Sequence, residues 1–170
     1  MSLNFEKLTD RAKNAENVFN RDISCKVYRA ENGVLSISRL VDQFHDITLA
    51  MLIDPTGFTV TEAFVKMERV PYEVCRKTAD GIKNIKGLFI LHPAVNREMR
   101  RKIKRKDGCT HLFELLEFTL QTLFTGGPRA GLNGEDLVKV DKELQPEEHR
   151  LLQMTNPRLK NTCLAFVPEE

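Results

Sequence analysis

The fold is decided by residues 21–69, which read RDISCKVYRAENGVLSISRLVDQFHDITLAMLIDPTGFTVTEAFVKMER. Apolar and polar residues alternate in four successive segments of this stretch, which is the pattern of half-buried strands. An Asn32-Gly33 pair separates the first two segments, and the turn sequence Asp54-Pro55-Thr56-Gly57 separates the last two. The pattern predicts four strands joined by short turns, beginning at Arg21 and then covering 34–41, 45–53 and 58–69.

Beyond residue 70 the apolar spacing changes to that of helices. One helix is predicted to begin at Pro71 and end at Gly87, and a second covers 94–106. A third has its N-cap at Thr110, carries a leucine-rich stripe and stops at Gly126-Gly127-Pro128. Together these elements predict an α+β fold in which an antiparallel sheet of about four strands has helices packed on one face.

The length of 170 residues fits one principal domain. We expect an N-terminal arm over 1–20, an α+β core domain over 21–125, and a C-terminal extension over 126–170 that packs on the same domain. Residues 5–19 place apolar side chains at roughly helical spacing, so the arm is expected to be frayed or helical.

The composition excludes several classes of protein. Apolar residues make up 41% of the chain and charged residues 29%, which excludes low-complexity and disordered classes. The 26 basic residues nearly balance the 24 acidic ones, so the surface as a whole is not built for a polyanion. The chain has no apolar stretch of ~20 residues and carries Glu6, Lys7 and Asp10 where a signal peptide is apolar. Because its four cysteines are widely separated, with no CxxC motif, we expect a cytoplasmic protein with reduced thiols.

Two cysteines are predicted at the starts of helices. Cys75 lies in the first turn after Pro71, and Cys109 precedes Thr110. The N–H groups of a helix start stabilise a thiolate, which is both a nucleophile and a metal ligand. His111 follows Cys109 by two residues, so the thiol and the imidazole can face one point. The alternative is that each cysteine is a small buried hydrophobic residue.

Several motifs resemble a known family of unknown function. Ser38-Arg39-Leu40-Val41-Asp42, Asp46, the segment 68–75 and Gly108-Cys109-Thr110-His111-Leu112 resemble an uncharacterised bacterial family over residues 21–125. More distantly, the succession of strands and helices is similar to the NifU/IscU-type iron–sulfur scaffold domain. That family packs helices on one face of a small antiparallel sheet, and it binds zinc or assembles a [2Fe–2S] cluster.

The NifU/IscU resemblance implies a metal site. The aspartate of that family falls on Asp46, its second cysteine on Cys75, and its closing histidine and cysteine on His111 and Cys109 in reversed order. Its first cysteine has no counterpart in this sequence, so His45 would have to replace it. The resemblance therefore implies zinc or an iron–sulfur cluster as the cofactor, and metal binding of the scaffold type is the function we favour.

A basic segment supports an alternative function. Residues 97–106 hold seven basic residues and one acidic residue, and the expected partner-binding residues are Arg97, Arg100, Arg101, Lys104 and Arg105. Such a cluster can contact an acidic protein, or it can be a solvated helix face. Aromatic residues are not interleaved with it, which argues against stacking on nucleic-acid bases.

A third function is that of a thiol enzyme, in which His111 or His45 deprotonates Cys75 or Cys109. The sequence contains no GxGxxG, Walker, GxSxG or HExxH motif, so dinucleotide, P-loop, serine-hydrolase and zincin functions have no support.

Overall fold

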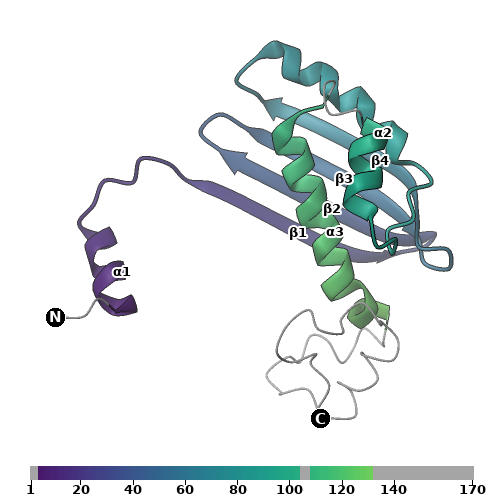
Figure 1. Cartoon of the computed structure of the whole chain (residues 1–170), viewed down its shortest axis with the longest axis horizontal. Helices are drawn as coiled ribbons and strands as arrows, with labels where there is room; N and C mark the ends of the chain where they lie inside the picture. The colour runs from purple at the N-terminus through teal and green to yellow at the C-terminus, as the bar shows by residue number, and fades with distance from the viewer. Residues whose placement is uncertain (1–3, 104–107, 132–170) are drawn as a thin grey trace, which may run out of the picture.

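The computed structural model describes residues 4–103 and 108–131, with side chains as far as residue 124. Its elements, in chain order, are α1 (Phe5–Lys13), β1 (Arg21–Ala30), β2 (Gly33–Asp42), β3 (Asp46–Asp54), β4 (Thr59–Arg69), η1 (Glu73–Ile85), α2 (Val95–Ile103) and α3 (Thr110–Gly131), as Figure 1 shows. The four strands form one antiparallel sheet in the order β1-β2-β3-β4. The predicted α+β fold is therefore confirmed.

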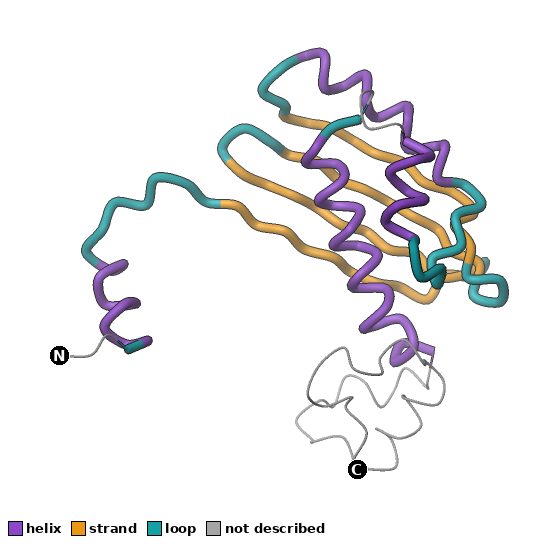
Figure 2. Tube along the Cα trace, in the orientation of Figure 1, coloured by secondary structure: helices purple, strands orange, loops and turns teal. Residues whose placement is uncertain are grey.

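Among the described elements, three helical segments cover one face of the sheet and none covers the other, which we call the open face (Figure 2). α3 packs on β1, β2 and β3, η1 packs on β4, and α2 packs on η1. Alternate residues of the strands meet the helices because side chains on a strand point to opposite faces in turn. The fully buried centre of this layer contains Leu40, Ile47, Leu49, Met51, Ile53, Ile82, Ile85, Met99, Leu112, Leu115 and Leu116.

The hairpin between β1 and β2 depends on Gly33. Its φ of +142° is strained for other residues, and a Cβ there would lie 2.4 Å from the Ile53 carbonyl oxygen on β3. Gly33→Ala should therefore lower the free energy of unfolding by about 2 kcal/mol or more. Gly87→Ala is the matched control, because Gly87 also has a positive φ (+74°) but has open space around it; its cost should be about 1 kcal/mol. Equal losses for the two variants in urea denaturation would contradict the steric argument.

The first covering helix differs from the prediction. Residues 73–85 form a 3₁₀ helix, and its buried or half-buried side chains include Cys75, Thr78, Ile82, Ile85 and then Leu88, at intervals of three residues with one interval of four. A period of three is that of 3₁₀ geometry. Val74 lies outside this series and is exposed.

α3 starts one residue earlier than predicted and ends later. The Cys109 carbonyl accepts the Phe113 N–H, so Cys109 holds the cap position and Thr110 is the first helical residue. The helix continues through Gly126, Gly127 and Pro128 as far as Gly131. About four turns of helix precede these residues and are already fixed against the sheet, so the low helix propensity of Gly126, Gly127 and Pro128 does not end the helix at once.

Some expectations lie outside the described residues. The C-terminal extension is described only as the backbone of the end of α3, and residues 104–107, which include Lys104 and Arg105, are not described. Within the described parts of the chain, no helix is long and apolar enough to cross a membrane.

Candidate functional site

A buried carboxylate organises the end of the sheet where β1 begins and β2 ends. The Asp42 side chain is fully buried, and its Oδ1 accepts the backbone N–H groups of Phe44 at 2.8 Å and His45 at 2.7 Å. Nε and Nη2 of Arg21 lie 2.9 Å and 2.8 Å from Oδ2. Burial raises the pKa of Asp42, but these hydrogen bonds and that of the His45 ring outweigh burial and hold it well below its usual range.

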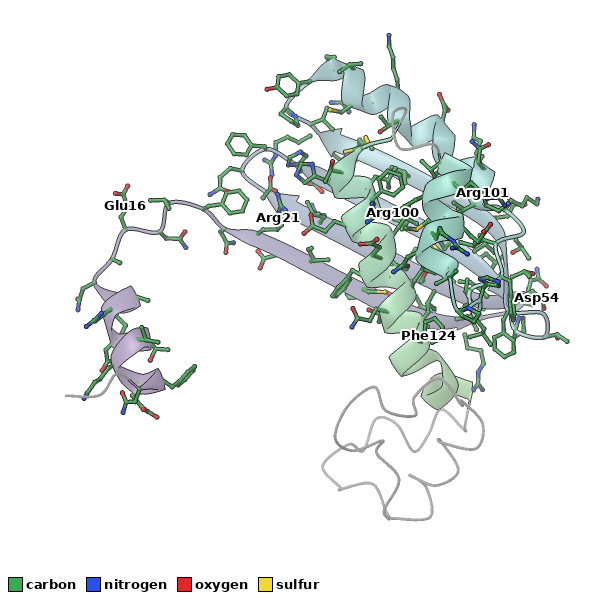
Figure 3. The ribbon with its side chains drawn as sticks, viewed as in Figure 1. Glu16, Arg21, Asp54, Arg100, Arg101 and Phe124 are labelled. Atoms are coloured by element: carbon green, nitrogen blue, oxygen red, sulfur yellow. The ribbon has the colours of Figure 1, made fainter. Side chains whose placement is uncertain are left out.

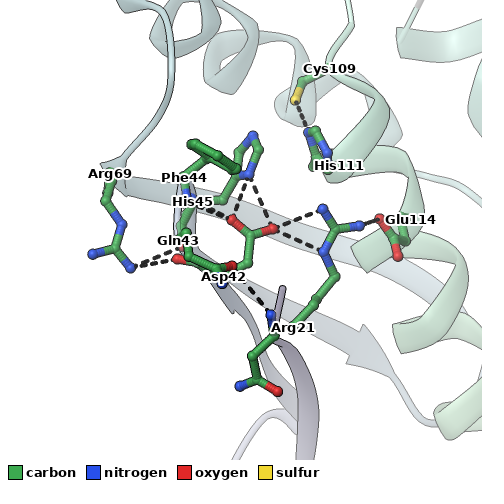
Figure 4. A network of polar contacts seen from close by, with 10 residues as sticks. Arg21, Asp42, Gln43, Phe44, His45, Arg69, Cys109, His111 and Glu114 are labelled. Atoms are coloured by element: carbon green, nitrogen blue, oxygen red, sulfur yellow. Dashed lines mark hydrogen bonds and ion pairs between the residues drawn. The ribbon is translucent and has the colours of Figure 1, made fainter. Parts of the chain in front are cut away.

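Arg21 and Arg69 tie this carboxylate to the surrounding elements. Nη1 of Arg21 lies 2.9 Å from Oε2 of Glu114, so Arg21 joins β1 to both β2 and α3 (Figures 3 and 4). Nη2 of Arg69 donates to the backbone carbonyl of Asp42 at 2.7 Å and to that of His45 at 3.3 Å. The loop that carries His45 is therefore held from both of its ends.

Two histidines and a thiol follow this carboxylate (Figure 4). Nδ1 of His45 lies 2.9 Å from Oδ1 of Asp42. A carboxylate only accepts, so Nδ1 of His45 carries the hydrogen of this contact. The His45 and His111 ring centroids are 3.8 Å apart, and Nδ1 of His111 lies 4.0 Å from Sγ of Cys109. We call Asp42, His45, His111 and Cys109 the thiol–imidazole cluster.

His111 is set up to be uncharged at neutral pH. Its pKa is lowered first by burial and then by the nearby His45 and Arg21. An uncharged imidazole has one nitrogen free to accept a proton. When Nδ1 faces the thiol as the acceptor, Nε2 carries the ring hydrogen.

Cys109 is only 8% exposed. Its neighbours in the chain, Gly108 and Thr110, line a shallow hollow together with Arg100 and Phe113. The N–H groups of the first turn of α3 also lie next to this thiol, and such groups stabilise a thiolate. The thiol is therefore buried at the start of α3, beside a hollow that its two chain neighbours line.

The structure does not bring Asp46 into the cluster. Asp46 pairs with Val41 across β2 and β3, so it lies on the face of the sheet opposite to Ile47 and the helices. Both of its oxygens bind Arg39, at 2.9 Å and 2.7 Å, and this contact lowers the pKa of Asp46. Its carboxylate thus serves a surface ion pair.

Cys75 also lies outside the cluster. It is half-buried in the first turn of η1, its N–H donates to the Tyr72 carbonyl, and its carbonyl accepts the Thr78 hydroxyl. Nowhere in residues 4–103 and 108–131 do three or more His, Cys, Asp or Glu side chains form a group able to hold a metal ion. The predicted ligand set of Asp46, Cys75, Cys109 and His111, with His45, is thus not assembled as a metal site.

Three of the four basic residues of α2, namely Arg100, Arg101 and Lys102, have partners within the described part of the chain. Arg100 pairs with Glu117 on α3 and lies 5.4 Å over the Phe113 ring, and Arg101 pairs with Glu98 (Figure 3). Lys102 donates to the Lys86 carbonyl. Much of this charge is neutralised within the fold, as on a solvated helix face.

Sequence reasoning found three members of the cluster but missed Asp42, Arg21, Glu114 and Arg69. The alternation in β2 carried a usable signal for Asp42. Ser38, Leu40 and Asp42 share one face of the strand, and Leu40 is fully buried. A carboxylate on the core face must be paired, so a basic partner on the neighbouring strand was to be expected.

Comparisons with known proteins give a family but no activity. A family model described as "Protein of unknown function (DUF2889)" matches residues 19–125, well over half of the chain. No curated protein matches, and no solved structure matches, so the similarity to the NifU/IscU-type domain has no support from these searches.

Proposed function

Because the chain belongs to DUF2889, a family of proteins of unknown function, we propose its function from the geometry of the site: Cys109 is the nucleophile of a thiol-dependent reaction, and His111 accepts its proton. The observation that supports this most is the 4.0 Å approach of Sγ of Cys109 to Nδ1 of a histidine whose pKa is lowered. An activated nucleophile needs an adjacent base of this kind.

The proposed step balances without a further reagent. The thiol proton moves to Nδ1 of His111, and the thiolate forms a bond to an electrophilic carbon while that carbon's leaving group departs. The imidazolium that results lies against the His45 ring, whose other side is anchored on the ionised Asp42. Asp42 and His45 are therefore positioning residues: the His45 ring, held by Asp42, keeps His111 in place, and the Asp42 carboxylate favours the positive charge that His111 gains.

The test is the rate at which iodoacetamide alkylates Cys109, followed by mass spectrometry of the peptide. His111→Phe keeps a ring against His45 but removes the base, and it should slow alkylation of Cys109 at pH 7.5 by about tenfold or more. Cys75 is the internal control, because its thiol makes no hydrogen bond to either histidine and its rate should stay unchanged. An unchanged Cys109 rate in His111→Phe would overturn the proposal.

Metal binding is the second candidate function, and one observation favours it. A carboxylate on one ring nitrogen, as in Asp42 and His45, is how proteins orient a metal-ligating histidine. Zinc or an iron–sulfur cluster would need donors beyond those that converge here. Elemental analysis separates the two functions: about one metal per chain, lost in Cys109→Ser, supports metal binding, and metal-free protein with a fast Cys109 supports the nucleophile.

A further inference from the structure

The N-terminal helix α1 presents apolar side chains that no other described part of its own chain covers. No residue of α1 is buried, and Phe5 and Leu8, which share one side of the helix, are 76% and 50% exposed. A helix of nine residues is marginal on its own in water. α1 therefore needs a surface against which this apolar side packs.

The open face of the sheet is such a surface. Two rows of facing residues cross its four strands, Tyr28–Leu35–Leu52–Glu62 and Lys26–Ile37–Ala50–Phe64, and each row is apolar or aromatic except for the charged residue at one end. Phe64 is 60% exposed and Tyr28 is 45% exposed, while all the covering helices lie on the other side (Figure 2). Monomeric proteins rarely leave a large apolar patch uncovered.

The dimensions of the two surfaces match. Nine helical residues are about 14 Å long at ~1.5 Å per residue. Four strands span about 14 Å at ~4.8 Å between neighbours. One α1 helix laid across the strands therefore crosses the whole open face.

The base of the arm is fixed in a direction that leads away from its own sheet. The Arg21 guanidinium lies 5.3 Å over the Phe19 ring, and Asn20 and Gln43 contact each other. Arg21 is in turn held by Asp42 and Glu114. From this anchored point the chain runs outward, and Glu16 lies far from the sheet (Figure 3).

We propose that the chain forms a dimer in which α1 of each copy packs on the open sheet face of the other. Such an exchange is reciprocal, so it closes with two-fold symmetry and leaves no free apolar surface of this kind. Phe5 and Leu8 of one copy then cover Tyr28, Ile37 and Phe64 of the other. The proposal goes beyond the thiol chemistry and does not depend on it.

The test is the mass of the full chain in solution, measured by light scattering after size-exclusion chromatography. The wild type should have twice the 19.5 kDa of one chain. The Phe5→Glu/Leu8→Glu double variant and Phe64→Glu should each weaken the dimer by more than about tenfold, because each buries charge. Val18→Glu is the matched control, since Val18 is an exposed apolar residue outside both surfaces.

Cross-linking identifies the contact itself. Benzoylphenylalanine in place of Phe64 should join, on irradiation, to residues 5–13 of a second chain and give a product of dimer mass. Dimerisation depends on concentration, so the wild type is also measured at about 100 µM. A wild type that is monomeric at this concentration would overturn the proposal. Three other results would also overturn it: a cross-link to α1 of the same chain, a dimer that is unchanged in both Phe5→Glu/Leu8→Glu and Phe64→Glu, or loss of the dimer in Val18→Glu.

Discussion

Replacing Asp42 with alanine is expected to lower the free energy of unfolding by about 3–5 kcal/mol. The change removes the acceptor for two backbone N–H groups, for the His45 ring and for the Arg21 guanidinium. Arg21, whose side chain is 25% exposed, keeps only its ion pair with Glu114. Breaking the buried contact costs this much because two backbone N–H groups and the buried His45 ring lose their acceptor.

Asp46→Ala is the matched control for this variant. Asp46 is also an aspartate at the end of a strand, and it also binds an arginine, but its partner Arg39 is 55% exposed. A pair on the surface contributes about 0–1 kcal/mol. The free energy of unfolding of both variants is measured by urea denaturation. If Asp42→Ala lowers it no more than Asp46→Ala does, the buried contacts of Asp42 do not contribute the expected stability.

The free energy of unfolding is also expected to fall by about 3 kcal/mol as the pH is lowered from 7 to 2. The pKa of Asp42 is lower in the folded chain than in the unfolded chain, so acid protonates the unfolded chain first. This contribution is complete above about pH 5 and is lost as the pH falls through 4 and below. His111 acts in the same direction, since its lowered pKa means that stability begins to fall below about pH 6.5.

Asp42→Asn tests whether Asp42 is the group responsible for the loss of stability in acid. The amide keeps the size of the side chain but does not titrate, so the stability of this variant should depend less on pH between 5 and 2. The measurement is urea denaturation at each pH, with the variant and the wild type side by side. Parallel curves for the two proteins over this range would show that other carboxylates cause the acid loss.

The sheet was predictable because it has one buried face. Where one face of a sheet is covered, apolar and polar residues must alternate along each strand. A shift of one residue in the pairing of two strands would turn the apolar side chains of one strand to solvent. The Asn32-Gly33 turn then fixed how β1 and β2 pair. The helical layer was less predictable, because a 3₁₀ helix over 73–85 and an α-helix share most of their apolar positions.

The site was predicted only in part, for a reason that lies in the geometry of strands. His45, His111 and Cys109 were found from their chemistry and from their places at the ends of elements. Asp46 was chosen from its place at the start of the third predicted strand and from the resemblance, although the alternation that buries Ile47 already turns Asp46 to the other face. The partners Arg21 and Glu114 lie 93 residues apart in the chain, and no local pattern connects them.

Arg21 also bears on how the thiol is protected. An edge strand is ordinarily the part of a sheet that peels away first. β1 is an edge strand, yet its first residue holds β2 through Asp42 and α3 through Glu114. If β1 separates from β2 at this end, Arg21 loses both Asp42, which holds His45, and Glu114 on the helix that carries His111. Cys109 therefore stays inaccessible to oxidants only while the edge strand remains paired.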